Sequence, residues 1–97
     1  MTSTIQINNS GTQANGNQYV CFAKIEVDEE GHRSIECVNL PGVLSDGETD
    51  EECVSNISEA FEEALLAYHE MGVDPPFTTS YNPTGCHVIS IRFPKEG

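Results

Sequence analysis

Acidic side chains are the most frequent chemically active groups in this sequence. The chain has 97 residues, with 16 Asp and Glu against 4 Lys and Arg, which gives a formal net charge of -12. Glutamates recur on the polar side of a helix predicted over residues 49–71: Glu51, Glu59, Glu62, Glu63 and Glu70. Carboxylates on one face attract the lysines and arginines of a basic protein. They are equally typical of a helix face that is simply hydrated, and the residues alone leave both interpretations open.

Metal-assisted cleavage of a phosphodiester is a second use of carboxylates, and it needs acids on a central strand. The first strand is predicted over residues 19–27, where only Glu26 stands near the end. Asp28, Glu29 and Glu30 follow in a predicted turn, where acids are usually hydrated. The pattern therefore favours a protein that is not an enzyme.

Cysteines and histidines are the remaining candidates for chemistry. The four cysteines are widely spaced, and the Cys86-His87 pair has no second pair at the short spacing of a structural zinc site. Cys53 falls in the first turn of the predicted helix, where the helix dipole lowers the pKa of a thiol. The periodicity nevertheless places Cys21, Cys37 and Cys53 on core-facing sides. We expect reduced, buried thiols, no metal and no cofactor.

Charge and hydropathy also exclude classes of partner. Binding to nucleic acid or to an anionic membrane needs cationic side chains, which this chain largely lacks. No apolar run approaches the ~18 residues of a membrane span, and residues 1–18 lack the basic and apolar regions of a signal peptide. The sequence predicts a cytoplasmic protein. Strong acidity with little lysine also suits a high-salt cytoplasm, and charge alone does not separate that explanation from a basic partner.

The elements that position these residues form one predicted domain over residues 19–97. Residues 1–18 are polar and uncharged, and we expect a flexible leader in which residues 4–7 could add a short edge strand. Alternation predicts a strand over residues 19–27 and a second over 34–38, which together make an antiparallel hairpin. Its predicted core-facing residues are Tyr19, Cys21, Ala23, Ile25, Val27, Ile35 and Cys37.

Turn and cap signals then follow closely. Leu40-Pro41-Gly42 predicts a type II turn, and residues 43–44 leave room only for a very short strand before Asp46-Gly47. Thr49 and Glu52 have the spacing of a capping box at the start of the helix. Gly72 is expected to end the helix as a C-terminal cap. The helical apolar stripe is predicted at Cys53 or Val54, Ile57, Ala60, Phe61, Ala64, Leu65, Tyr68 and Met71.

A polar loop over residues 75–85 and a last strand over residues 86–93 complete the prediction. Ile89, Ile91 and Phe93 alternate toward the core. The expected fold class is α+β, with a small antiparallel-dominated sheet of three to four strands and one long helix packed on one face.

In this order, the motifs resemble the HicB-like antitoxin family of type II toxin-antitoxin systems, whose members have a partial ribonuclease H fold. The resemblance covers residues 19–22, 39–42 and 45–49, the acidic helix and the exit at 72–76. The family usually has Asp, Cys and Asp where this chain has Asn39, Val43 and Glu48. The retained structural motif consists of Leu40, Pro41, Gly42, Gly47, Thr49 and Glu52.

The resemblance implies a non-catalytic protein that neutralises a small basic mRNA-cleaving toxin of the HicA type by protein-protein contact. The five helix glutamates are then the partner-binding residues. Many members carry a C-terminal DNA-binding segment, but four residues follow Phe93 here, so we expect no separate DNA-binding domain. The alternative is an orphan homo-oligomeric module that regulates or scaffolds without a toxin. An unpaired strand edge favours a homodimer or larger assembly in either case.

Overall fold

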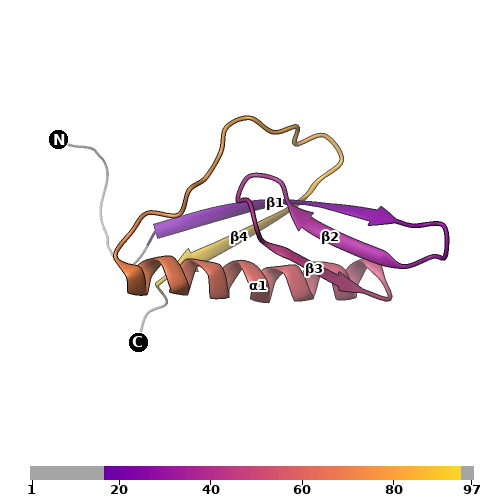
Figure 1. Cartoon of the computed structure of the whole chain (residues 1–97), viewed down its shortest axis with the longest axis horizontal. Helices are drawn as coiled ribbons and strands as arrows, with labels where there is room; N and C mark the ends of the chain where they lie inside the picture. The colour runs from indigo at the N-terminus through magenta and orange to yellow at the C-terminus, as the bar shows by residue number, and fades with distance from the viewer. Residues whose placement is uncertain (1–16, 95–97) are drawn as a thin grey trace.

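The structure, a computed structural model, describes residues 17–94 and contains four strands and one helix in that range. The elements are β1 (Asn17–Val27), β2 (Arg33–Cys37), β3 (Leu44–Gly47), α1 (Asp50–Met71) and β4 (His87–Phe93). The strands form one antiparallel sheet in the order β3-β2-β1-β4. α1 runs along one face of this sheet, and the segment between α1 and β4 arches over the other side (Figure 1). The predicted α+β fold is confirmed.

β1 starts earlier than the sequence pattern predicts. Asn17 and Gln18, assigned to the leader, pair with Phe93 and Arg92 of β4 and so belong to the sheet. Backbone pairing with a strand far away in the sequence extends β1 here, and hydrophobic alternation does not detect such pairing. Residues 1–16, with the predicted strand at 4–7, lie outside the described residues.

β3 is longer than predicted and is formed by different residues. The predicted strand over residues 43–44 is in fact Leu44–Gly47, and Val43 is a buried residue just before it. Asp46 and Gly47 pair with β2 as strand residues, although their types are typical of a turn. A Cβ atom on Gly47 would lie 2.7 Å from the backbone nitrogen of Cys53, so only glycine lets β3 approach the start of α1 this closely.

The ends of α1 follow the predicted caps with one change. Thr49 Oγ1 accepts a hydrogen bond from the backbone N–H of Glu52 at 3.0 Å. The Glu52 carboxylate accepts from the backbone N–H of Glu48, one residue before the position that a standard capping box uses. Gly72 has φ of 73° and ends the helix as predicted.

The core lies between α1 and the sheet. Its helix residues are Cys53, Ile57, Phe61 and Leu65, which share one side of α1 at four-residue spacing. The sheet and turn residues buried against them are Cys21, Ala23, Ile35, Cys37, Leu40, Val43 and Phe93. Burial of this apolar area is the main stabilising contribution to the fold.

Two apolar residues predicted in the core are exposed instead. Val27 and Met71 are 53% and 63% exposed. Each is the last residue of its element, where periodicity continues but the opposite layer no longer covers the side chain. Ile89 and Ile91 of β4 face the α1 side as predicted, but they are only partly buried.

Candidate functional site

The candidate site is the outer side of α1, away from the core residues. α1 carries no Lys or Arg and has these acidic residues: Asp50, Glu51, Glu52, Glu59, Glu62, Glu63 and Glu70. We use the term acidic face for Glu51, Glu59, Glu62, Glu63 and Glu70. Four of these side chains are exposed, and Glu62 is partly buried. The structure thus places all five predicted residues on the surface of one helix.

Three residues of the acidic face line one shallow groove. Glu59, Glu62 and Glu63 surround a hollow of about 460 Å³, which Leu66 and Phe93 also line. Leu66 is 45% exposed, whereas Phe93 is a buried core residue at 8% exposure. An apolar surface bordered by carboxylates suits a lysine or arginine, because the aliphatic stem can pack on carbon while the charged end reaches an acid.

The other two residues of the acidic face stand farther along the helix. Glu51 precedes Glu59 by two turns, or about 12 Å at 1.5 Å per residue, and Glu70 follows Glu63 by about 10 Å. The five predicted residues are therefore one central group of three with a single carboxylate on each side. We call the central group with Leu66 and Phe93 the acidic groove.

Leu66 is a site residue that sequence reasoning missed. The predicted apolar stripe includes Leu65, which is 1% exposed, and leaves out the next residue. A large apolar residue just off a helical stripe is the signal that was present in the sequence. No sequence signal marks Phe93 as a residue that lines the groove, because its position there depends on how β4 and α1 pack.

The sequence distinguishes Asn39 only as a difference from the HicB-like motif and predicts no role for it, yet Asn39 is the buried polar residue of the described core. Its Nδ2 donates to the carbonyl oxygen of Val20 at 2.8 Å, and its Oδ1 accepts from the backbone N–H of Phe22 at 2.9 Å. β2 has already ended at Cys37, so the Asn39 amide continues the hydrogen bonding of β1 in place of a strand. Its backbone oxygen also accepts from Thr78 N–H, which ties down the segment after α1.

The structural-motif residues lie outside the acidic groove, and those at the turn after β2 serve this arrangement. Leu40 is fully buried in the core, and Pro41 with Gly42 forms the exposed turn that follows it. Gly42 has φ of 91°, which a residue with a side chain adopts only with strain. This turn holds Asn39 against β1, so its role is to position the chain.

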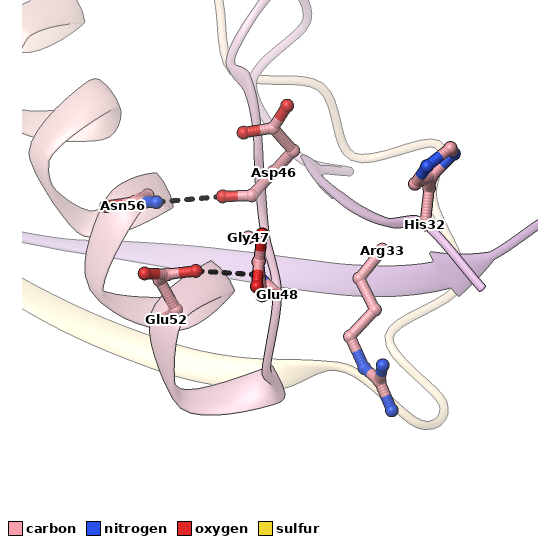
Figure 2. Close-up of a pocket in the computed structure, with 7 residues that line it drawn as sticks. All are labelled: His32, Arg33, Asp46, Gly47, Glu48, Glu52 and Asn56. Atoms are coloured by element: carbon pink, nitrogen blue, oxygen red, sulfur yellow. Dashed lines mark hydrogen bonds between the residues drawn. The ribbon is translucent and has the colours of Figure 1, made fainter.

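A second hollow, of about 410 Å³, lies where β3 meets the start of α1 (Figure 2). Asn56 and Glu52 point from α1 to the backbone of β3, where Asn56 Nδ2 donates to the carbonyl oxygen of Asp46 at 2.8 Å. Arg33 also borders this hollow, and its Nε lies 2.9 Å from Asp50 Oδ1. These bonds fasten β3 and the start of β2 to α1, and they indicate a structural role.

The acids at the β1–β2 turn are also explained by local structure. Asp28 Oδ1 accepts from the backbone N–H groups of Glu30 and His32, both at 2.9 Å. The N–H of His32 is the main group that lowers the pKa of the Asp28 carboxyl. Across residues 17–94, no cluster of three or more His, Cys, Asp or Glu side chains has an arrangement that could hold a metal ion.

The surroundings of the cysteines do not favour a nucleophilic thiol. Cys21, Cys37 and Cys53 are buried, and all four cysteines are free thiols. Burial raises the pKa of the Cys53 thiol, against the lowering that its place near the helix start suggested. The pKa of Cys21 is also raised, by its hydrogen bond to Cys37 and by burial. A buried thiol with a raised pKa forms little of the thiolate that acts as a nucleophile. The pKa of the Cys37 thiol is lowered to about 7, mainly by its hydrogen bond with Cys21, but Cys37 is only 1% exposed and a substrate cannot reach it.

α1 is the one helix of the described range, and its acidic residues leave it without the apolar stretch that a membrane span requires. A scan of the chain against models of known protein families finds no match, and a search among curated proteins finds none either. The resemblance to HicB-like antitoxins, carried by the motifs around residues 39–49 and by the acidic helix, therefore stays a prediction.

Proposed function

We propose that this chain is a non-catalytic, antitoxin-like cytoplasmic protein that binds a small basic ribonuclease of the HicA type. The observation that carries the proposal is the acidic groove, three carboxylates around an exposed leucine on a helix without a single Lys or Arg. The order and type of the elements agree with the partial ribonuclease H fold that the resemblance implies. Toxin neutralisation and charge reversal distinguish this function from an acidic surface that binds no partner.

The acidic groove supplies both of the forces that a protein interface needs. The net charge of -12 steers a basic partner toward the molecule and speeds the encounter, most strongly at low ionic strength. Leu66 provides an apolar contact that does not depend on salt. Binding should therefore have a salt-sensitive part from the glutamates and a salt-insensitive part from Leu66.

Inhibition follows from what a ribonuclease must present to its substrate. RNA is held largely by lysines and arginines that contact phosphates. A surface of carboxylates competes for those same cations, so a toxin bound at the acidic groove cannot hold RNA there. In this mechanism the antitoxin needs no catalytic group of its own.

A growth assay tests the function directly. The probes are the protein encoded by the neighbouring reading frame and a HicA-type toxin, each expressed with and without this chain. The proposal predicts that the neighbouring frame encodes a short basic protein, and that co-expression of this chain restores growth and spares mRNA. A neighbour without toxicity, together with failure to rescue cells from the HicA-type toxin, would refute the proposal.

Charge reversal tests the site. Glu59→Lys with Glu63→Lys should weaken binding of the toxin at least about tenfold at low salt, because two attractive contacts become repulsive. The matched control is Glu26→Lys with Glu29→Lys, which changes the net charge equally at exposed residues on and beside β1. Equal losses in the two double variants would show that overall charge, and not the acidic groove, governs binding.

Leu66→Ala tests the apolar part of the same site. It should weaken binding by a similar factor at low and high salt, because only buried apolar area is lost. An affinity unchanged by this substitution at high salt would contradict the assignment of Leu66 to the interface.

A further inference from the structure

The two edges of the sheet differ in whether another strand can add to them. β3 and β4 are the outer strands, and within residues 17–94 neither has a second neighbour. β3 has only four residues, and α1 holds it through the bonds from Asn56 to the Asp46 carbonyl and from Glu48 N–H to Glu52. β4 has seven residues and forms a full-length ladder with β1. An edge of that length is a template for strand pairing.

β4 is also the edge that a copy of this acidic protein can approach. Its sequence, His-Val-Ile-Ser-Ile-Arg-Phe, contains no carboxylate, although the chain carries sixteen, and Arg92 is its one Lys or Arg. β3, by contrast, carries Asp46. The strand itself therefore adds no carboxylate to a contact between two copies of this chain, whose net charge is -12.

Apolar side chains of β4 remain exposed on both faces of the sheet. Val88 is 64% exposed on the face away from α1, and Ile89 and Ile91 on the α1 side are only partly buried. Most aliphatic side chains of β4 thus keep area that folding of one chain does not cover. This is the arrangement expected of a strand that gains a neighbour.

We infer that two copies of this chain pair antiparallel through their β4 strands and form one continuous eight-stranded sheet. Pairing centred on Ser90 uses the whole strand and sets Ile89 opposite Ile91 of the second copy, so that both become more buried. The same register sets Val88 opposite Arg92 and keeps the two Arg92 residues apart. A two-fold axis perpendicular to the sheet places both α1 helices on the same side.

The proposed dimer does not depend on the proposed toxin binding, and the two associations should respond to salt in opposite directions. The acidic groove lies between α1 and β4, since Phe93 lines it, so the dimer brings the two grooves toward each other. Salt screens the repulsion between them and should strengthen the dimer, whereas it should weaken the binding of a basic toxin. Glu59→Lys with Glu63→Lys removes most of this repulsion, so the double variant should lose toxin binding without any weakening of the dimer.

Sedimentation velocity over a concentration series measures the assembly. We expect a monomer–dimer equilibrium that shifts toward dimer as NaCl is raised. Val88→Lys should raise the dissociation constant about tenfold, because each introduced lysine would face Arg92 of the other copy and the pair occurs twice. The matched control is Leu44→Lys, an equally exposed aliphatic residue (63%) on the same face of the other edge strand, and it should change nothing.

A compensating change tests the register itself. Adding Arg92→Glu to Val88→Lys turns the facing like charges into opposite ones and should restore the dimer. Circular dichroism checks that each variant folds, because its helix and strand content should equal that of the wild type. A second readout is hydrogen exchange of the unchanged protein, where the β4 amides should become more protected as concentration rises. A wild-type chain that stays monomeric at all concentrations, equal effects of Val88→Lys and Leu44→Lys, or no rescue by Arg92→Glu would overturn the inference.

Discussion

Replacing Asn39 by aspartate exchanges one side-chain NH2 group for an oxygen at a position that is 6% exposed. The new oxygen would face the carbonyl oxygen of Val20, to which the Asn39 Nδ2 now donates at 2.8 Å. The bond from Phe22 N–H to the other oxygen is retained. The variant thus loses one hydrogen bond, leaves a carbonyl without its donor and adds a charge inside the protein.

The expected cost can be worked out from these contacts. A buried carbonyl left without a donor costs about 1–3 kcal/mol, and the poorly solvated charge adds to it, so we expect Asn39→Asp to lose about 3 kcal/mol at neutral pH. Asn39→Ala removes both bonds, together with the bond that Asn39 Oδ1 accepts from Cys37 Sγ at 3.1 Å, and should lose about 2–4 kcal/mol. Losses of this size are a large fraction of the stability of a small domain.

Acid distinguishes the two variants. Protonation of the introduced carboxylate restores a donor for Val20, so the folded form of Asn39→Asp is favoured below the usual carboxyl pKa of about 3.9. The stability that the protonated carboxyl contributes is lost as the pH rises through the pKa of the introduced carboxyl in the folded variant, which is higher than the usual value. The deficit of Asn39→Asp relative to the wild type should therefore shrink toward about pH 4, whereas the deficit of Asn39→Ala should not.

Urea unfolding followed by far-ultraviolet circular dichroism is the suitable assay, since the chain has no tryptophan to report by fluorescence. Asn82→Ala is the control. It removes the bond that the exposed Asn82 side chain accepts from Thr84 N–H within the same turn, and it should cost less than about 1 kcal/mol. A loss below about 0.5 kcal/mol for Asn39→Ala, or a pH-independent deficit for Asn39→Asp, would refute the role given to Asn39.

Three further predictions concern the path from the hairpin into α1. Gly47→Ala would place a Cβ 2.7 Å from Cys53 N and should lower stability by about 1–3 kcal/mol; an unchanged urea midpoint would contradict that close approach. Thr49→Ala should cost about 1 kcal/mol in the same assay and Thr49→Ser much less, because serine keeps the capping oxygen. The pKa of Asp28 is lowered in the folded state, so its support of the turn is complete above the usual carboxyl pKa and lost as pH falls through the lowered value. Hydrogen exchange, corrected for its intrinsic pH dependence, should show that the His32 amide loses protection in acid. The same loss of protection should be absent in Asp28→Asn.

Local signals predicted the elements well, because the interactions that create them involve neighbouring residues. Thr49 caps the helix through a bond three residues away, and Gly72 ends it within one turn. Ile35 and Cys37 are buried as their alternation predicts, because both faces of the β1–β2 hairpin are set by one short turn. In these cases sequence distance and spatial distance are nearly the same.

Predictions were wrong or incomplete where distant segments decide the outcome. Asn17 joins the sheet only because Phe93 pairs with it, and no property of residues 1–18 reveals that. The acidic groove needs Leu66 of α1 and Phe93 of β4 side by side, although the glutamates themselves were found from spacing. The bonding role of Asn39 arises because β2 ends at Cys37 and leaves part of β1 without a neighbouring strand. Each of these requires knowledge of how layers and strands meet.

The position of β1 in the sheet has a consequence for synthesis on the ribosome. β1 pairs with β2 a few residues later, but its other partner is β4, with Asn17 opposite Phe93 at the far end of the described chain. Among the strands of the described range, β1 therefore emerges first and waits for β4, the last, before its second edge is covered. During that interval β1 presents an open edge to other nascent chains, and a ribosome that pauses before residue 87 prolongs the exposure.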